Sequence, residues 1–283
     1  MHNVCIFCKS KKLAIRYVVS DFHILQCKEC GLSFVGEVLS KEELIPYYEK
    51  QKLDVSVYSD EANKENLKYY YSKIADHICQ RVPTGKILDV GCSSGYFLDC
   101  MLEYGWECHG IEMDARYAER ARGKHGSHIS GGALEEYECP QDFFDVISMQ
   151  DVLDHLPDPL KALAKCHDLL KPGGLLIVKV HDVSSLYARI TGSKYYAILP
   201  PLHLVYFDRR NLLAMLEASG FGVEQYEYFP HLLFLKTVLG WLSPENKRHV
   251  LSRICASLGS SLIGKIRIKK NLFDIVTVFA HKK

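Results

Sequence analysis

The stretch Lys86–Phe97, KILDVGCSSGYF, joins a short apolar run to a loop that contains two glycines. The run KILDV is typical of a buried strand, and GYFLDCMLEYG after it has the spacing of an amphipathic helix. A loop between such a strand and such a helix lies where open α/β sheets bind ligands. Backbone N–H groups and the helix dipole favour a negative group there, and Gly91 and Gly95 allow it to approach closely.

The spacing of these glycines excludes two common phosphate-binding loops. Ser93 stands where the dinucleotide pattern G-x-G-x-x-G has its second glycine, and no Lys-Ser or Lys-Thr follows Gly95 as in a P-loop. A small anion such as an amino-acid carboxylate therefore fits better than a pyrophosphate. Glu112 ends the next apolar run, where an acid can accept hydrogen bonds from both ribose hydroxyls. Both features together favour S-adenosylmethionine (SAM), which carries a carboxylate and a ribose.

Downstream of this loop, short apolar runs alternate with amphipathic helices as far as FDIVTVFA near the C-terminus. The segment DPLKALAKCHDLLKPGG is expected to be a helix, with Asp158 as its N-cap and Gly173 beyond its end. Asp208 and Gly220 similarly bound DRRNLLAMLEASG. This alternation predicts an α/β fold, in which helices cover both faces of a mostly parallel sheet.

Two C-x2-C pairs near the N-terminus are separated by eighteen residues, and they consist of Cys5, Cys8, Cys27 and Cys30. This spacing is typical of a structural zinc site with four thiolate ligands. The runs LAIRYVV and FHILQC between the pairs are expected to be strands. A segment of about forty residues buries little core, so the metal would supply folding energy. Reduced buried cysteines and a thioredoxin-like redox pair are the alternatives.

Several motifs occur together in one order: ILDVGCSSGYFL, GIEMD, FDVISMQDVLDHLPDP, LLKPGGLLIVKV and HLVYFDRRNLLAMLEASGF. In this order they resemble a class I SAM-dependent methyltransferase, up to about Phe229. CIFC, LQCKECGLSFV and SKEELIPYYE resemble a bacterial branch of that class with a zinc ribbon before the catalytic domain. Its members often act on sugars, surface glycans or other small metabolites. The resemblance implies a Rossmann-like sheet, mostly parallel, with an antiparallel last strand and a helical cap.

The resemblance also implies which residues bind SAM. The glycine loop would surround the methionine part, Glu112 would bind the ribose, and Met113 would lie against adenine. The full predicted set is Asp89, Gly91, Cys92, Gly95, Phe97, Glu112, Met113, Gln150 and Asp151. Two departures from the family pattern are Ser93 and the segment GGALEEY, which has no clear aspartate before the adenine-contacting position. Ala133 and Leu134 are candidates for that position.

Methyl transfer to a hydroxyl or a carbon acid needs a base, and histidine is the usual candidate. His181 ends the run VKVH, and His203 lies in PPLHLVYF, which is expected to cover the site. We predict that His181 or His203 is the base, whereas a hydrogen bond that stabilises a loop is the alternative for each. His155 is expected to be structural. The segment SLYARITGSKYYAILPP is expected to form a lid over the substrate.

The formal net charge of +1 gives no general attraction to nucleic acid or anionic membrane. The sequence shows neither a signal-peptide pattern nor a long apolar run, so a cytoplasmic protein is expected. The expected partner is a small-molecule acceptor such as a sugar or glycan precursor. Two alternatives are an RNA methyltransferase, with Lys9, Lys11, Lys12 and Arg16 near the ribbon, and a zinc-dependent interaction protein without activity.

These expectations divide the chain into a zinc ribbon (1–40), a helical connector (41–82) and a methyltransferase domain (83–283). Residues 231–265 have helical apolar spacing with interleaved lysine and arginine, and they are expected to be a helical insertion. This insertion would be a cap or a homodimer contact, or it would attach to a membrane surface or a lipid-linked acceptor.

Overall fold

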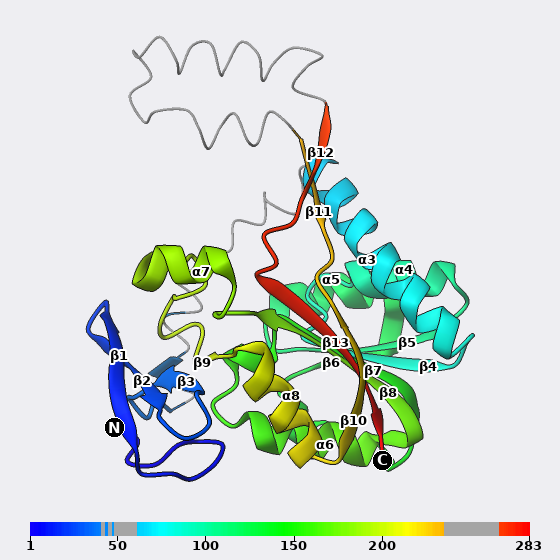
Figure 1. Cartoon of the computed structure of the whole chain (residues 1–283). Coiled ribbons are helices and arrows are strands. Elements are labelled where there is room, and N and C mark those ends of the chain that lie inside the picture. Colours follow the sequence, from blue (N-terminus) through cyan, green and yellow to red (C-terminus); the bar gives the residue numbers. More distant parts are fainter. Residues whose placement is uncertain (41–42, 45–46, 48–60, 235–265) are drawn as a thin grey trace.

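The computed structural model describes residues 1–40, 43–44, 47, 61–234 and 266–283. Strands and helices alternate through most of the described chain, as Figure 1 shows. The strands are β1 (Leu13–Val19), β2 (Phe22–Cys27), β3 (Ser33–Val35), β4 (Lys86–Val90), β5 (Glu107–Glu112), β6 (Ile129–Gly131), β7 (Phe144–Gln150), β8 (Leu170–His181), β9 (Val205–Tyr206), β10 (Phe221–Glu227), β11 (His231–Phe234), β12 (Arg267–Lys270) and β13 (Ile275–Lys282). The α-helices are α3 (Glu61–Arg81), α4 (Tyr96–Glu103), α5 (Ala115–His125), α6 (Pro159–Leu169), α7 (Leu186–Thr191) and α8 (Arg209–Ala218).

The central sheet has seven strands in the order β10-β13-β8-β7-β4-β5-β6. Strands β6, β5, β4, β7 and β8 run parallel, whereas β13 is antiparallel to both of its neighbours, β8 and β10. This arrangement confirms the predicted fold class, including the antiparallel last strand. The carboxyl ends of β4, β5, β7 and β8 lie at one edge of the sheet, where ligands bind in this architecture.

Each face of the sheet has its own apolar core, because successive side chains of a strand point to opposite faces. On one face, Ile87 and Val146 pack with residues of α3 and α4 such as Ile74 and Leu98. On the other face, neighbouring strand residues such as Leu88 pack with residues of α6 and α8. Strands covered on both faces explain the continuous apolar runs of the sequence.

Side-chain caps fix where several helices begin. Asp158 accepts a hydrogen bond from the Lys161 N–H, as the sequence predicts, and Pro159 follows it in the first turn of α6. Asp208 and Asn211 form a reciprocal capping box at the start of α8. Such caps satisfy N–H groups that the first helical turn would otherwise leave without partners.

The N-terminal segment forms a second sheet in the order β1-β2-β3-β9. Strands β1 and β2 are the two expected hairpin strands. Strand β9 comes from the far part of the sequence and pairs antiparallel with β3, joining Phe34 to Val205 in register. Figure 1 shows this sheet in blue beside β9 and α8. The N-terminal segment is therefore joined by strand pairing to the part of the chain that follows β8.

Two sequence expectations differ from the structure. The helix expected to end near Gly173 ends at Leu169, and strand β8 begins at once and contains that glycine. The insertion expected to be helical from residue 231 begins instead as strand β11, which pairs with β12. A short apolar run suits a strand or a helix equally, which explains this error. Residues 235–265 of that insertion and 48–60 of the connector lie outside the described residues.

Candidate active site

The loop after β4 makes its turn through three residues with positive φ: Gly91 (74°), Ser93 (49°) and Gly95 (81°). Gly91 also approaches the turn after β7, since an added Cβ would come within 2.5 Å of Val152 Cγ2. Ser93 occupies the position of the missing middle glycine and takes up the left-handed conformation there. The loop thus keeps its shape without a third glycine.

Most N–H groups of this loop are already bonded within the protein. The N–H groups of Gly91 and Cys92 both donate to the carbonyl of Ile111, at 2.8 and 3.0 Å, and that of Gly95 donates to the carbonyl of Cys92. The sequence predicts that these N–H groups hold a carboxylate. Because they are bonded within the protein, they are not free to do so. The close approach of the backbone, rather than a ring of free N–H groups, makes the loop a ligand surface.

Glu112 ends β5 and connects the loop with the next helix. Its two carboxylate oxygens accept hydrogen bonds from the N–H of Ser93 at 2.9 Å and from the N–H of Asp114 at 2.8 Å. Burial raises the pKa of Glu112, which these N–H groups oppose. Asp114 itself caps α5 by accepting from the Arg116 N–H. The acid is thus held at the loop, with Met113 beside it and 60% exposed.

The side chain of Asp89 lies beneath the loop and is 4% exposed. Its Oδ1 has no hydrogen-bond partner among the described residues. Burial raises the pKa of this carboxyl to about 8, against the opposing hydrogen bond to Ser148. Cys92 and Phe97 are also buried, and their side chains belong to the apolar core behind the loop. Contact between either of these two residues and a cofactor would come from the main chain.

The floor of the site lies at the end of β7. Gln150 donates from Nε2 to Ser148 Oγ at 3.0 Å, while its buried Oε1 has no partner among the described residues. Asp151 adopts a positive φ of 56° and forms an ion pair of 2.6 Å with Lys179 of β8. The Lys179 ammonium also lies 4.7 Å from the centre of the Tyr70 ring. Asp151 therefore has a fixed counter-ion at the sheet edge.

Three histidines surround one buried carboxylate, that of Asp154, which is 2% exposed. The Oδ2 atom of Asp154 is 3.0 Å from Nδ1 of His203 and 3.5 Å from Nδ1 of His181, so only the first is a hydrogen bond. His155 instead directs its Nδ1 to the carbonyl of Leu202 at 2.8 Å. The structure therefore brings the two predicted bases together and gives His155 the structural bond expected of it.

The contacts between Asp154 and the neighbouring histidines shift the pKa values of these groups. Burial would raise the pKa of Asp154, but the neighbouring imidazoles of His181 and His203 hold it well below its usual range. Burial would lower the pKa of His181, and the Asp154 carboxylate raises it above its ordinary value. For His155, burial dominates and lowers the pKa. A permanently ionised carboxylate thus lies behind two imidazoles.

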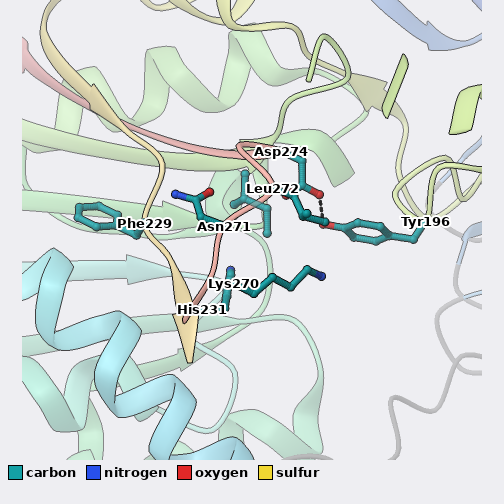
Figure 2. A pocket seen from close by; sticks show the side chains of 8 residues that line it. Tyr196, Phe229, His231, Lys270, Asn271, Leu272 and Asp274 are labelled. Carbon is teal, nitrogen blue, oxygen red and sulfur yellow. Dashed lines mark hydrogen bonds between the residues drawn. The ribbon is translucent and has the colours of Figure 1, made fainter. Parts of the chain in front are cut away.

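A small pocket, shown in Figure 2, lies between Tyr196 of the expected lid, the side chains of Phe229 and His231, and the segment that joins β12 to β13. Asp274 accepts hydrogen bonds from the hydroxyls of Tyr196 at 2.8 Å and Tyr195 at 3.1 Å. The ring of Tyr196 lies 5.4 Å from that of His181. The pocket is lined by Tyr196, Phe229, His231, Lys270, Asn271, Leu272, Asp274 and Ile275. Its wall is mixed aromatic and polar, which suits a small hydroxylated ligand.

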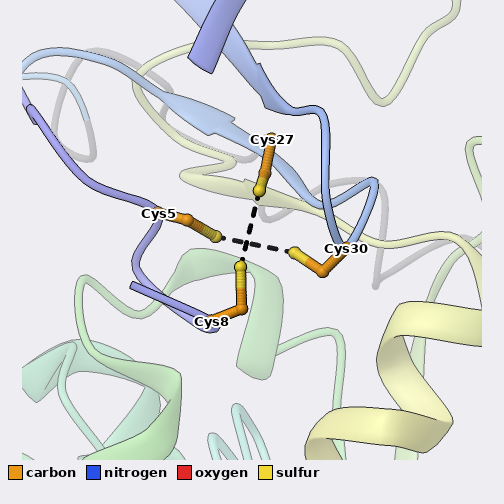
Figure 3. Close-up of side chains that lie close together, drawn as sticks. All are labelled: Cys5, Cys8, Cys27 and Cys30. Atoms are coloured by element: carbon orange, nitrogen blue, oxygen red, sulfur yellow. Dashed lines mark hydrogen bonds between the residues drawn. The ribbon is translucent and has the colours of Figure 1, made fainter. Parts of the chain in front are cut away.

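The four N-terminal cysteines converge on one point, which Figure 3 shows. Sγ of Cys5 is 3.6 Å from that of Cys30, and Sγ of Cys8 is 3.5 Å from that of Cys27. Sulfurs at the corners of a zinc tetrahedron lie about 3.8 Å apart, given a bond of about 2.3 Å. Burial raises the pKa of Cys5 and Cys30, whereas the N–H groups of Cys30 and Glu29 lower that of Cys27 to about 7 against the effect of burial. The donor set and its spacing could hold zinc.

Two residues of the site escaped the sequence analysis. Asp154 lies in the motif LDHLPDP, in which the neighbouring His155, and not Asp154, was the residue with a predicted role. Lys179 lies inside the strand run LLIVKV, where a lone lysine in an apolar run was the available signal. A charged residue within a buried strand is rare unless it is paired, so this lysine could have been recognised. Ala133 and Leu134 flank a short turn after β6, and Leu134 is buried in the core.

Comparison with known proteins agrees with this geometry. Residues 61–226, more than half of the chain, match the family model described as a methyltransferase domain. The ubiquinone biosynthesis O-methyltransferase of Shewanella sp. (strain ANA-3) is 27% identical over 144 residues, which are 47% of this chain and 61% of that protein. The protein of the same name from Actinobacillus pleuropneumoniae serotype 5b (strain L20) is 35% identical over 129 residues, 41% of this chain and 55% of that protein. The chain thus matches somewhat more than half the length of these relatives.

Solved structures show the same fold at low sequence identity. The 1,6-didemethyltoxoflavin-N1-methyltransferase of Burkholderia thailandensis, solved with S-adenosylhomocysteine bound, has a TM-score of 0.53 at 14% identity, covering 95% of this chain and 99% of that chain. The YcgJ protein of Bacillus subtilis has a TM-score of 0.51 at 15% identity, covering 76% and 98%. Within the described residues, no helix combines the length and apolar content that crossing a bilayer requires. The chain belongs to the methyltransferase-domain family and has the Rossmann-like fold of class I methyltransferases.

Proposed function

We propose that this enzyme transfers a methyl group from SAM to an oxygen or a carbon of a small hydroxylated molecule, such as a sugar or a glycan precursor. The observation that carries the proposal is the pair His181 and His203, which faces the buried carboxylate of Asp154, with the ring of Tyr196 from the pocket wall 5.4 Å from that of His181. An amine acceptor needs a base less than a hydroxyl or a carbon acid does. The relatives named as O-methyltransferases also favour oxygen.

In this proposal, SAM lies across the carboxyl ends of β4, β5 and β7. Glu112 binds the ribose hydroxyls, and Met113 covers the adenine from its exposed position. Oδ1 of Asp89 and Oε1 of Gln150, which lack partners among the described residues, would accept hydrogen bonds from donors on SAM. SAM, when bound, supplies a methyl carbon on a sulfonium. The thioether that forms from the sulfonium leaves without needing an acid.

The acceptor enters through the pocket beside Tyr196. His203 directs Nδ1 to Asp154, so the neutral imidazole has its lone pair on Nε2. That nitrogen takes the proton from the acceptor as its oxygen or carbon forms the new bond to the methyl group. The ionised Asp154 stabilises the resulting imidazolium, and His181 shares the same carboxylate. Enclosure by Tyr195 and Tyr196 limits the access of water.

The proposed set of residues divides into two groups that mutation can separate. We expect Glu112→Ala to weaken SAM binding by about 10- to 100-fold, because the paired acceptors for the ribose are lost. Asp114→Ala is the matched control, since it removes a helix cap and an ion pair with Arg116 but no proposed ribose acceptor, and it should change the affinity less than about threefold. Isothermal titration measures both, and equal affinity in the wild type and Glu112→Ala contradicts the ribose assignment.

The acceptor half is tested with His203→Ala. We expect turnover to fall by about 100-fold or more, within the range for loss of a general base, while SAM affinity stays the same. His128→Ala is the control, because that histidine lies before β6, away from the Asp154 cluster. The measurement is S-adenosylhomocysteine formation with a panel of sugars, phenols and amines, after mass spectrometry of co-purified ligands. Undiminished turnover in His203→Ala rules out its role as base.

We also propose that Cys5, Cys8, Cys27 and Cys30 hold one structural zinc ion. All four positions would be filled by thiolates, so this ion would have no open position for chemistry.

A further inference from the structure

The strand that follows His203 belongs to the N-terminal sheet and not to the catalytic one. Val205 and Tyr206 form β9, which pairs with β3 at Phe34 and Ser33. The candidate base therefore lies only two residues before a strand whose hydrogen-bonding partner is the four-cysteine ribbon. This topology links two parts of the molecule that the sequence analysis treated separately.

The loop that carries His203 is fixed from two sides. On the catalytic side, the N–H of Leu204 donates to the carbonyl of Asp154 at 2.8 Å, and His155 bonds the carbonyl of Leu202. On the other side, the N–H of Val35 in β3 donates to the carbonyl of Leu204 at 2.8 Å. The peptide groups that flank His203 thus join the turn of Asp154 to the ribbon.

The turn that contains Cys27 and Cys30 also holds β3 in place. The N–H of Cys27 donates to the carbonyl of Leu32 at 2.9 Å, and the N–H of Gly31 donates to the carbonyl of Cys27 at 3.0 Å. Strand β3 begins three residues after Cys30. Any force that closes the four-cysteine cluster therefore acts directly on the start of β3.

Apolar packing makes the connection rigid. Ribbon residues such as Cys5, Cys27 and Phe34 are no more than 1% exposed. They belong to one continuous core with Val205 and Leu153, which lie on either side of the catalytic cluster in the sequence. A close-packed core transmits displacements, because it has no free volume to absorb them.

We infer that the N-terminal ribbon is a positioning element of the active site: through the β3–β9 pairing it holds His203 against Asp154. The inference rests on the proposed role of His203, and it gives the four-cysteine cluster a catalytic consequence although it touches no reacting atom. A shift of about 1 Å in a positioned group can cost about 100-fold in rate. Opening the ribbon should therefore lower kcat and leave SAM affinity unchanged, because the proposed methionine and ribose contacts lie on β4 and β5.

Two variants open this connection at different points. Phe34→Ala removes the buried ring of β3, and Cys8→Ser removes the exposed cysteine of the cluster without creating a cavity in the core. Ile15→Ala is the matched control, because Ile15 lies in β1 of the same ribbon and is 58% exposed. We expect kcat to fall at least tenfold in Phe34→Ala and Cys8→Ser, and SAM affinity to stay within about twofold in all three.

Hydrogen exchange provides a readout that does not depend on activity. In Phe34→Ala and Cys8→Ser, amide exchange of residues 204–206 should accelerate together with that of β3, while β4 and β5 stay protected. Faster exchange in β3 with unchanged exchange at 204–206 and unchanged kcat overturns the inference. A wild-type protein that methylates no acceptor defeats the proposed function instead, and the exchange result still decides whether the ribbon holds the loop.

Discussion

Gly91 is the point where the SAM loop touches the turn after β7, so it tests whether the close approach matters. Gly91→Ala would add a positive-φ strain of about 1–2 kcal/mol, and its methyl would meet Val152 Cγ2 at 2.5 Å. Gly105→Ala carries the same strain at φ 81° but meets no atom within 4 Å. We expect Gly91→Ala to be about 1–3 kcal/mol less stable than Gly105→Ala and to lose SAM affinity.

Urea denaturation gives the two free energies of unfolding, and titration gives the two affinities. Equal effects of both substitutions would mean that Val152 moves away without cost. The loop would then be defined by backbone conformation alone, and its distance from the β7 turn would have no part in binding.

Asp89 should release a proton when SAM binds. Its pKa of about 8 lies above the ordinary value of 3.8, so the folded protein holds it protonated at pH 7. The positive charges of SAM would favour the carboxylate and lower that pKa. Titrations at pH 7 in buffers of different ionisation enthalpy should show close to one proton released, and Asp89→Asn should release none. An equal proton count in both proteins contradicts the assignment.

The same pKa has a consequence for stability without ligand. A folded-state pKa raised above the unfolded value gives stability that is complete below pH 4 and is lost as the pH rises through about 8. Over this range, unfolding free energies of the wild type should fall relative to those of Asp89→Asn.

Among the secondary-structure elements, those with clear caps and long periodic runs could be predicted, and those held by distant partners could not. Helix α8 agrees with its sequence pattern because Asp208 caps it locally. Strands β3 and β9 have three and two residues; β3 pairs with the neighbouring β2, whereas the partner of β9 is β3, about 170 residues away. A short segment without its own periodicity has no local signal, so this pairing could not be read from the sequence.

The cysteine turns allow a test by metal content. We expect the purified chain to hold one zinc ion, and Cys27→Ala to lose it together with several degrees of thermal stability, because metal binding contributes directly to folding. Cys139→Ala is the control, since Cys139 lies outside the cluster of four. Elemental analysis measures the zinc. Equal zinc in both variants would place the metal elsewhere.

Across the whole molecule, the sequence motifs predicted the SAM half in more detail than the acceptor half. The SAM residues follow consecutive strands and carry a spacing that one chain can reveal. The acceptor cluster instead joins Asp154 after β7, His181 at the end of β8 and His203 before β9. Their hydrogen bonds depend on how these ends meet in space. Both histidines were found as candidates, but their shared carboxylate required the fold.

The distribution of charge predicts weak binding to nucleic acid. Of the basic residues near the ribbon, Lys12 pairs with Glu29 at 2.5 Å, and Arg16 donates to Ser33. With a net charge of +1, we expect filter binding at 150 mM salt to detect no saturable RNA complex. Saturable binding whose logarithm falls steeply with the logarithm of salt concentration would restore an RNA acceptor as the substrate.

Strand β13 lies between β8 and β10, although both of these strands leave the ribosome before it. While the chain is being synthesised, β10 has no adjacent strand of the sheet to join, and the edge of β8 stays open. The central sheet of the nascent chain therefore stays incomplete, with an unpaired strand edge, until residues 275–282 emerge. Exposed edges of this kind invite pairing with other chains. A ribosome that stalls before residue 275 would thus release a product prone to aggregate, even though every residue of the proposed SAM site had already been made.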